Sequence, residues 1–179
     1  MSKHDKYRVE LVPFKRCFVA KTVEWVNDPE IINLIDRSPK PVTLEECYKW
    51  CDDILEDSKK TMFAILTEKK KLHIGNCGLF EIDERSRKAK LWIYIGEKSM
   101  WNKNLGRDAL EQLVIYGFDE LKLNRIYLYV VEGNKRAQEL YQSAGFSKEG
   151  VLRQDTFLEG EFKDTMYYGI LKDEFNKKR

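Results

Sequence analysis

Residues 134–146 read NKRAQELYQSAGF, and this stretch does most to decide the fold class. It opens with Asn134, a residue type that caps helix N-termini, and it closes on Gly145, which suits the left-handed position after a helix. The apolar residues between them recur at helical spacing. Residues 124–131, just before, are rich in Ile, Tyr and Val and predict a strand. A strand followed by an Asn-capped helix predicts a fold that mixes both element types.

Outward from this stretch, the chain alternates between strand-like and helix-like apolar patterns. We expect strands over 7–12, 61–66, 72–83, 88–95, 124–131, 146–158 and 162–171, and helices over 15–26, 43–57, 106–121 and within 134–146. The strands from 61 to 95 form an antiparallel meander, and Glu159-Gly160 is a hairpin turn. The pattern predicts an α+β fold around a mixed, mostly antiparallel sheet, in one domain over residues 1–179.

Length and charge exclude several classes of function. The 179 residues suit one domain, and 32 Lys and Arg against 30 Asp and Glu give a net charge of only +2. Nucleic acid is therefore not an expected partner, because phosphate-backbone binding demands a basic surface. The apolar runs are shorter than the ~18–20 residues that span a bilayer, so no membrane contact is expected. Residues 1–6 lack a secretory pattern, which predicts a cytoplasmic location.

The cysteines and histidines do not have the spacing of a metal site. No C-x-x-C pair occurs among the four cysteines, and the two histidines are far apart in the chain. We therefore expect no metal. Cys47 and Cys51 lie four residues apart, as reduced packing residues on one helical face do.

A second stretch, MWNKNLGR at residues 100–107, joins a predicted strand to a predicted helix. It contains Gly and Asn, which tolerate positive φ, so its backbone N–H groups can point at one anion. The helix N-terminus, Lys103 and Arg107 add positive charge, and a phosphate or diphosphate is the expected ligand. Neither a P-loop nor a Rossmann glycine pattern is present. Taken alone, a polar loop that only caps a helix is the competing interpretation.

Together, residues 101–106 and 134–146, placed after a meander, resemble two motifs of the GNAT superfamily of acyl-CoA-dependent N-acetyltransferases. The first motif is approximately [QR]-x-x-G-x-[GA], and the second is N-x-x-A-x-x-x-Y-x-x-x-G-F. Further segments, such as WVNDPE at 25–30 and EGVLR at 149–153, look like the branch of ribosomal-protein N-terminal acetyltransferases. Spermidine and amino-sugar acetyltransferases look similar too. The resemblance implies acetyl-CoA as co-substrate and a sheet that is splayed at its central cofactor-binding strands.

The resemblance also implies which residues bind the cofactor. Backbone groups of the splayed strand would hold the pantetheine, loop amides the diphosphate, and Asn134 the other side of the pantetheine arm. The implied set is Ile93, Tyr94, Ile95, Trp101, Asn102, Lys103, Asn104, Leu105, Gly106, Arg107 and Asn134. Asn102 and Asn104 stand where relatives usually have Gly, and Trp101 where many have Gln or Arg. Asn is the non-Gly residue that most readily enters the left-handed region, so diphosphate binding is still expected.

In the implied mechanism, an acceptor amine attacks the thioester directly, and Tyr141 is the general acid for the leaving thiolate. Glu81, on a meander strand at alternate parity to Phe80 and Ile82, is the expected base, with a solvated strand carboxylate or a water chain as the alternatives. An alkyl amine of pKa near 10.4 costs roughly 4.6 kcal/mol to deprotonate at pH 7, and an α-amine about 1 kcal/mol. An alkyl amine therefore needs a carboxylate more than an α-amine does.

The acceptor itself stays open at this point. A protein N-terminal amine is slightly favoured over a polyamine or a nucleotide-linked amino sugar, and a non-catalytic acyl-CoA sensor is the alternative of another class. Retention of Asn134 and Tyr141 favours catalysis. Residues 31–43 and the hairpin around 159–160 are the expected acceptor loops, and the protein is expected to be a monomer or a homodimer.

Overall fold

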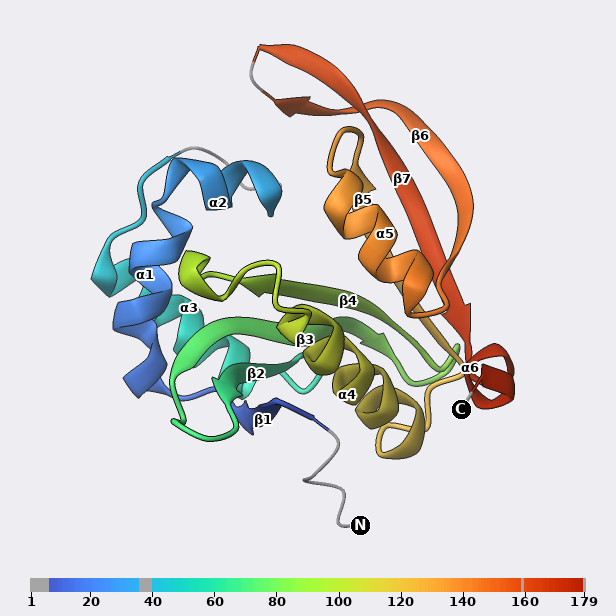
Figure 1. Cartoon of the computed structure of the whole chain (residues 1–179), viewed down its shortest axis with the longest axis horizontal. Helices are drawn as coiled ribbons and strands as arrows, with labels where there is room; N and C mark the ends of the chain where they lie inside the picture. The colour runs from blue at the N-terminus through green and yellow to red at the C-terminus, as the bar shows by residue number, and fades with distance from the viewer. Residues whose placement is uncertain (1–6, 36–39, 159, 179) are drawn as a thin grey trace.

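The chain builds a seven-stranded sheet of strand order β1-β2-β3-β4-β5-β7-β6 (Figure 1). A computed structural model describes residues 7–35, 40–158 and 160–178. Neighbouring strands are antiparallel except β4 and β5, which run parallel. The strands are β1 Val9–Pro13, β2 Thr61–Thr67, β3 His73–Asp83, β4 Lys88–Ile95, β5 Arg125–Val131, β6 Ser147–Leu158 and β7 Glu161–Leu171. The expected α+β fold with a mixed, mostly antiparallel sheet is confirmed.

Helices cover both faces of the sheet. They are α1 Val19–Val26, α2 Pro29–Leu34, α3 Leu44–Glu56, α4 Leu105–Asp119, α5 Lys135–Ser143 and α6 Lys172–Lys178. One face packs on α4 and α5 in a core that includes Leu110, Leu113 and Tyr141. The other face packs on α1 and α3 around Val19 and Cys51. Each covering helix is amphipathic, as the apolar spacing predicted.

The sheet opens between β4 and β5. Only three residues of each strand pair, and the last pair joins Lys90 to Tyr127. Beyond that pair, β4 stays bonded to β3 through Ile95, while β5 stays bonded to β7 through Val131. The two halves of the sheet therefore diverge from a vertex, as Figure 1 shows for β4 and the hairpin formed by β6 and β7.

A bulge in β3 changes the expected parity of Glu81. The register between β3 and β4 shifts between Phe80 and Asp83, and Glu81 has a φ of 53°. As a result Phe80 packs on the α1 and α3 side, whereas Ile82 packs on the α4 side. The parity assumed from the sequence was wrong, because strict alternation holds only where no extra residue interrupts the ladder.

Two segments differ from their sequence-based boundaries. Residues 31–34 belong to helix α2 rather than to a loop, because the Asp28 side chain caps this helix, accepting a hydrogen bond from the Glu30 N–H at 3.0 Å, and Pro29 occupies its first turn. The expected acceptor-loop residues 36–39 lie outside the described residues, as do residues 1–6, Glu159 of the hairpin turn and Arg179. The C-terminal tail forms α6, where Phe175 packs on Phe118 with ring centroids 5.6 Å apart.

Candidate functional site

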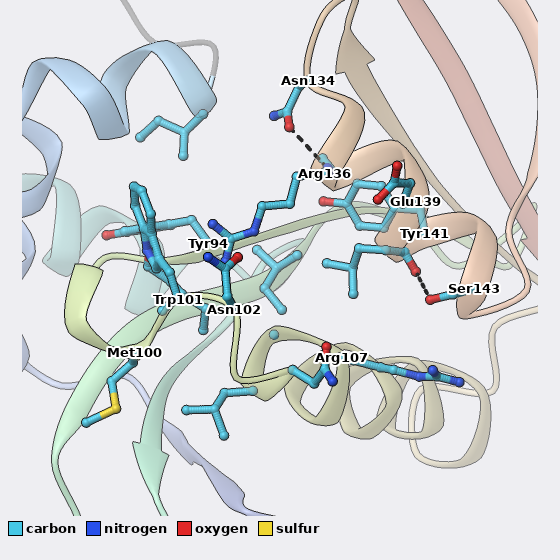
Figure 2. Close-up of a pocket in the computed structure, with 18 of the residues that line it drawn as sticks. Tyr94, Met100, Trp101, Asn102, Arg107, Asn134, Arg136, Glu139, Tyr141 and Ser143 are labelled. Carbon is cyan, nitrogen blue, oxygen red and sulfur yellow. Dashed lines mark hydrogen bonds between the residues drawn. The ribbon is translucent and has the colours of Figure 1, made fainter.

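A cavity of about 490 Å³ opens where β4 leaves β5, within the size range of small-molecule sites (Figure 2). Four parts of the chain line it, namely α2, the end of β4, the loop that leads into α4, and α5. The lining residues are Ile31, Ile35, Ile93, Tyr94, Ile95, Met100, Trp101, Asn102, Asn104, Leu105, Gly106, Arg107, Asn134, Arg136, Ala137, Glu139, Leu140, Tyr141 and Ser143.

The loop before α4 has the backbone conformation of an anion site. Asn102 and Asn104 have φ of 59° and 58°, in the left-handed region that the sequence predicted for them. Asn104 is the N-cap residue of α4, yet its side chain does not cap the helix. Its contribution is therefore the left-handed backbone itself, which leads the chain directly into the positive end of the helix.

Trp101 ties this loop to the splayed strand. The indole Nε1–H donates a hydrogen bond to the Ile95 carbonyl at 2.7 Å. The Arg136 guanidinium of α5 lies over the same indole, 5.1 Å from the ring centroid, and Figure 2 shows Arg136 extending from α5 toward the loop. A Trp in place of Gln or Arg thus fixes both the loop and a cation at the cavity.

Asn134 and Tyr141 both lie on α5 or at its start. The Ala137 N–H donates to Asn134 Oδ1 at 3.1 Å, so Asn134 caps the helix and also lines the cavity. Tyr141, 7% exposed, packs on Phe146 with ring centroids 5.8 Å apart. Burial raises the pKa of Tyr141, so its hydroxyl keeps its proton at neutral pH.

A buried polar network lies behind the cavity wall. Asn76 is fully buried, and its amide donates to the Tyr94 hydroxyl and to Thr22 Oγ1, both at 2.9 Å. Its carbonyl oxygen lies 2.8 Å from His73 Nε2. Burial lowers the pKa of His73, whose Nδ1 is buried without a partner. The network fixes Tyr94 on the cavity wall through side chains that the sequence did not single out.

Glu81 does not line the cavity. It lies at the vertex of the splay, where its carboxylate accepts a hydrogen bond from the Tyr127 hydroxyl at 2.8 Å and lies 3.7 Å from Lys90 Nζ. Tyr127, Tyr129 and Tyr167 pack together beside it, and Lys90 Nζ lies 4.8 Å from the Tyr129 ring centroid. We call Glu81, Lys90 and these three tyrosines the vertex cluster.

The vertex cluster lies on the sheet face opposite α4. Lys90 alternates along β4 with Ala89 and Leu91, and Tyr127 alternates along β5 with Ile126 and Leu128; these apolar neighbours belong to the core under α4. Ile93, which lines the cavity, is three residues from Lys90, about 10 Å along the strand. The vertex cluster therefore lies where the two strands separate, and the cavity lies about 10 Å further along β4.

The structure brings together nearly all of the site residues expected from sequence. The expected residues on β4, in the loop and on α5 line the cavity, with the exception of Lys103, which instead contacts Met100 Sδ through its Nζ at 3.8 Å. Glu81 lies outside the cavity. Ile31 and Ile35, which were expected in an acceptor loop, also line the cavity, and sequence reasoning missed Arg136. For Arg136 the signal was its place two residues after Asn134 on a helix that faces the loop.

Other site types find no support among the residues that the structure describes. No group of three or more His, Cys, Asp or Glu side chains is arranged to hold a metal ion in this part of the chain. The four cysteines are free thiols. Of the described helices, none combines the length and the apolar character needed to cross a membrane.

Comparison with known proteins adds independent information. A family model described as an acetyltransferase (GNAT) domain matches residues 8–147. A spermidine N(1)-acetyltransferase of Vibrio cholerae is 31% identical over 132 residues, covering 74% of this chain and 73% of its own. YdaF of Bacillus subtilis, named as a candidate ribosomal N-acetyltransferase, is 32% identical over 101 residues, covering 56% of this chain and 55% of its own.

A solved structure is similar over nearly the whole chain. Spermidine N-acetyltransferase from Vibrio cholerae, in complex with CoA and spermine, has a TM-score of 0.89 at 25% identity. The match covers 94% of this chain and 98% of that one. The fold is thus shared with a protein that was crystallised in complex with CoA.

Proposed function

Because the chain belongs to the GNAT acetyltransferase family and is an acetyl-CoA-dependent N-acetyltransferase, we propose that acetyl-CoA binds in the cavity beside β4 and that the acceptor is an alkyl amine of the polyamine class. One observation supports the acceptor assignment. The Glu81 carboxylate lies at the vertex of the splay beside Tyr127 and Tyr167, where it could bind an ammonium group. The similarity to spermidine acetyltransferases supports the same class.

The loop before α4 holds the diphosphate. Its left-handed residues Asn102 and Asn104 give it a backbone that can direct amides at one anion, and the N-terminus of α4 adds a positive dipole end. Arg107 and Arg136 line the same cavity and supply mobile charge. The cofactor is thus held mainly by backbone groups, which explains why a chain of net charge +2 suffices.

The pantetheine arm runs along the free side of β4. Past Lys90, Ile93 and Tyr94 have β3 on one side and the cavity on the other. The Gly96 N–H bonds the Ile74 carbonyl of β3, so by alternation Tyr94 also turns its backbone groups toward β3, whereas Ile93 and Ile95 turn theirs toward the cavity. The Ile95 carbonyl is already bonded to Trp101, so the backbone of Ile93 and the N–H of Ile95 are the main partners for the arm. Backbone N–H groups there also serve as donors to the oxygen that becomes negative when the amine attacks.

Tyr141 acts on the leaving group. Its hydroxyl lies on α5 in the cavity and stays protonated at neutral pH because burial raises its pKa. A protonated hydroxyl can donate to the sulfur as the C–S bond breaks, which a thiolate leaving group requires. No enzyme nucleophile takes part, since the amine attacks the thioester carbon directly.

Glu81 serves the acceptor. A polyamine nitrogen is protonated at pH 7, and exposing its lone pair costs roughly 4.6 kcal/mol, so a carboxylate that accepts the proton makes a large contribution. The vertex cluster also has the chemistry of ammonium binding, because Lys90 Nζ already lies between the Glu81 carboxylate and the Tyr129 ring. Burial and the hydrogen bond to Glu81 raise the pKa of Tyr127, which therefore remains a donor.

A protein N-terminal amine is the second candidate. It is favoured by the similarity to YdaF and by the low cost, about 1 kcal/mol, of deprotonating an α-amine. Such an acceptor needs only a water chain as base. With a water chain as base, Glu81 would have no catalytic role despite its left-handed backbone and its hydrogen bond from Tyr127. We therefore place this acceptor second.

The test follows free thiol while the protein is incubated with acetyl-CoA and one acceptor at a time. The acceptors are spermidine, a lysine-free peptide with a free α-amine, and an amino-sugar nucleotide. We expect acceptor-dependent thiol release that is fastest with spermidine, with a matching mass increase of the polyamine. Thiol release with the peptide alone would replace the polyamine by the second candidate, and no release with any amine would overturn the catalytic assignment.

A further inference from the structure

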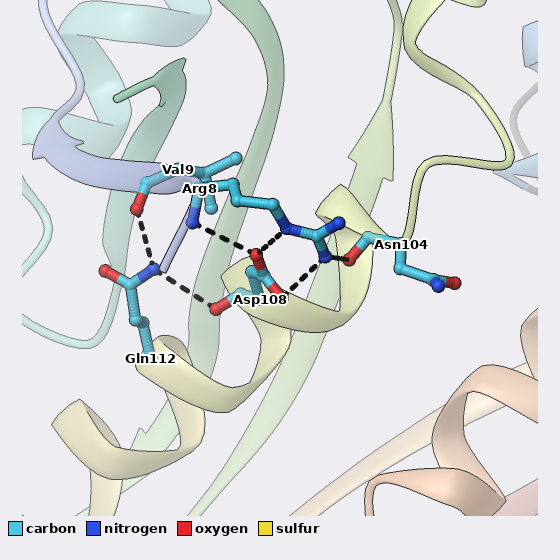
Figure 3. Close-up of polar contacts among 5 residues, drawn as sticks. All are labelled: Arg8, Val9, Asn104, Asp108 and Gln112. Carbon is cyan, nitrogen blue, oxygen red and sulfur yellow. Dashed lines mark hydrogen bonds and ion pairs between the residues drawn. The ribbon is translucent and has the colours of Figure 1, made fainter. Parts of the chain in front are cut away.

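Arg8, at the start of the described chain, contacts the first turn of α4 across a separation of 100 residues (Figure 3). Its guanidinium donates to both carboxylate oxygens of Asp108, from Nε at 2.9 Å and from Nη2 at 3.1 Å. The Arg8 backbone N–H also donates to Asp108 Oδ2 at 3.1 Å. The side chain of Asp108 is only 16% exposed, so the carboxylate of this ion pair is partly shielded from solvent.

The same guanidinium reaches the loop. Nη2 of Arg8 donates to the backbone carbonyl of Asn104 at 3.3 Å. Asn104 is the left-handed residue that sets the direction of the loop as it enters α4. Arg8 is therefore bonded both to the helix and to the strained residue just before it, and we call Arg8, Asp108 and the Asn104 carbonyl the loop clamp.

A left-handed Asn is held only when its surroundings favour that conformation, because the conformation itself is unfavourable. The Asn104 side chain makes no capping bond. The Asn104 backbone carbonyl accepts the first helical bond, from the Asp108 N–H at 3.3 Å, and the bond from Arg8 is the tertiary contact that adds to it. Asp108 has a second effect. Its carboxylate lies in the first turn of α4, where it stabilises the helix N-terminus and also orients the Arg8 guanidinium.

We infer that Arg8 is a positioning residue for cofactor binding, holding the loop amides in their diphosphate-binding conformation through Asp108 and the Asn104 carbonyl. This inference rests on the proposed diphosphate site at residues 102–107. The ligand group concerned is the diphosphate of CoA, so Arg8 is expected to affect neither pantetheine binding nor acceptor binding.

The test measures the dissociation constant of acetyl-CoA by calorimetry, together with steady-state kinetics, for the Arg8→Met and Asp108→Ala variants. We expect each variant to weaken acetyl-CoA binding about 5- to 10-fold, with KM raised and kcat at saturation unchanged. The Asp108 result is the sharper of the two. Removing a negative charge beside an anion site would tighten binding if charge alone mattered, whereas loss of the clamp weakens it.

A matched control separates the clamp from simple docking of β1 on α4. Gln112, one turn further along α4, donates to the Val9 carbonyl at 3.0 Å and to the Asp108 backbone carbonyl at 3.2 Å, so it joins β1 to α4 through backbone carbonyls and not through the Asp108 carboxylate (Figure 3). We expect Gln112→Met to bind acetyl-CoA like the unchanged protein. S-acetylpantetheine, which lacks the diphosphate, is the second control, and its kcat/KM should be equal in the Arg8→Met variant and the unchanged protein.

Four results would each overturn the inference: unchanged acetyl-CoA binding in Arg8→Met, tighter binding in Asp108→Ala, an equal loss of acetyl-CoA binding in Gln112→Met, or an equal loss of kcat/KM with S-acetylpantetheine in Arg8→Met. Gly106→Leu separates this failure from failure of the cofactor site. A Cβ at Gly106 would lie 3.6 Å from Ile95 and 3.9 Å from Leu140, which both line the cavity, so a leucine there projects into it. Normal binding in Gly106→Leu would refute the site itself, whereas lost binding there with normal binding in Arg8→Met would refute only the clamp.

Discussion

Lys90 and Tyr127 form the last paired residues of β4 and β5, and their side chains meet Glu81 on the face of the sheet away from α4. The pair marks the vertex from which the sheet opens into a cavity lined by α5 and the loop before α4. The vertex therefore has the proposed cofactor site on one side and the proposed amine site on the other. This arrangement permits direct attack without an enzyme intermediate.

The left-handed backbone at Asn104 is the first feature to test. A non-Gly residue in this region costs roughly 1–2 kcal/mol, less for Asn, so Asn104→Ala should lower the free energy of unfolding by about 1 kcal/mol and raise the acetyl-CoA KM. Asn104→Gly is the matched variant and should keep both values near those of the unchanged protein. Urea unfolding and initial rates measure the two effects, and an equal response to Ala and Gly would contradict this account.

Tyr141→Phe tests the general acid. We expect kcat to fall about 100-fold, the lower end of the usual contribution of such a group, with acetyl-CoA binding unchanged because the ring still packs on Phe146. Tyr168→Phe is the matched control, since Tyr168 is a buried tyrosine on β7 outside the cavity lining. If both variants lost activity equally, or if neither did, the role of Tyr141 would be refuted.

Glu81→Gln tests the base. For spermidine we expect kcat/KM at pH 7 to fall about 100-fold, because the carboxylate no longer accepts the proton of an alkyl ammonium. For a peptide α-amine the loss should be below about fivefold, since deprotonation costs only about 1 kcal/mol. Glu84→Gln, in the exposed turn after β3, is the control. Equal losses for the two amines would show that Glu81 does not act as a base.

His73 predicts a pH dependence of stability. It lies between the rings of Phe18 and Trp25, with centroids 4.8 and 4.7 Å away, and burial lowers its pKa below the usual value near 6.5. The unfolded chain then binds the proton more readily, so stability is full above about pH 6.5 and falls as the pH drops toward the folded pKa. His73→Gln should flatten this decline between pH 7.5 and 5.5 in urea unfolding, and an unchanged slope would contradict the prediction.

Sequence patterns predicted the features that depend on local spacing. The strand periods gave the meander, Asn134 and Gly145 bounded α5, and the Asn residues of the loop adopted the positive φ that their type favours. Tyr141 lines the cavity because it lies seven residues, about two helical turns, after Asn134 and so is on the same face of α5. Each of these depends on residues within one element or at its ends.

Features that depend on distant contacts or on irregular backbone were not predictable. The Arg8 contact with Asp108 joins residues 100 apart, and no pattern in one sequence reports it. The bulge at Glu81 interrupts a period that the sequence continues, and α2 extends to Leu34 in a segment that was expected to be a loop. The stacking of Arg136 on Trp101 likewise needs α5 and the loop to be placed first.

The most direct test of the central claim is hydrogen exchange with and without acetyl-CoA, followed by mass spectrometry. The account predicts slower exchange at residues 93–95 and 102–107 when acetyl-CoA is bound, because the arm and the diphosphate bond those amides. The hairpin of β6 and β7 should exchange at the same rate in both states. Slower exchange elsewhere, with residues 102–107 unchanged, would contradict the cofactor site between β4 and α5.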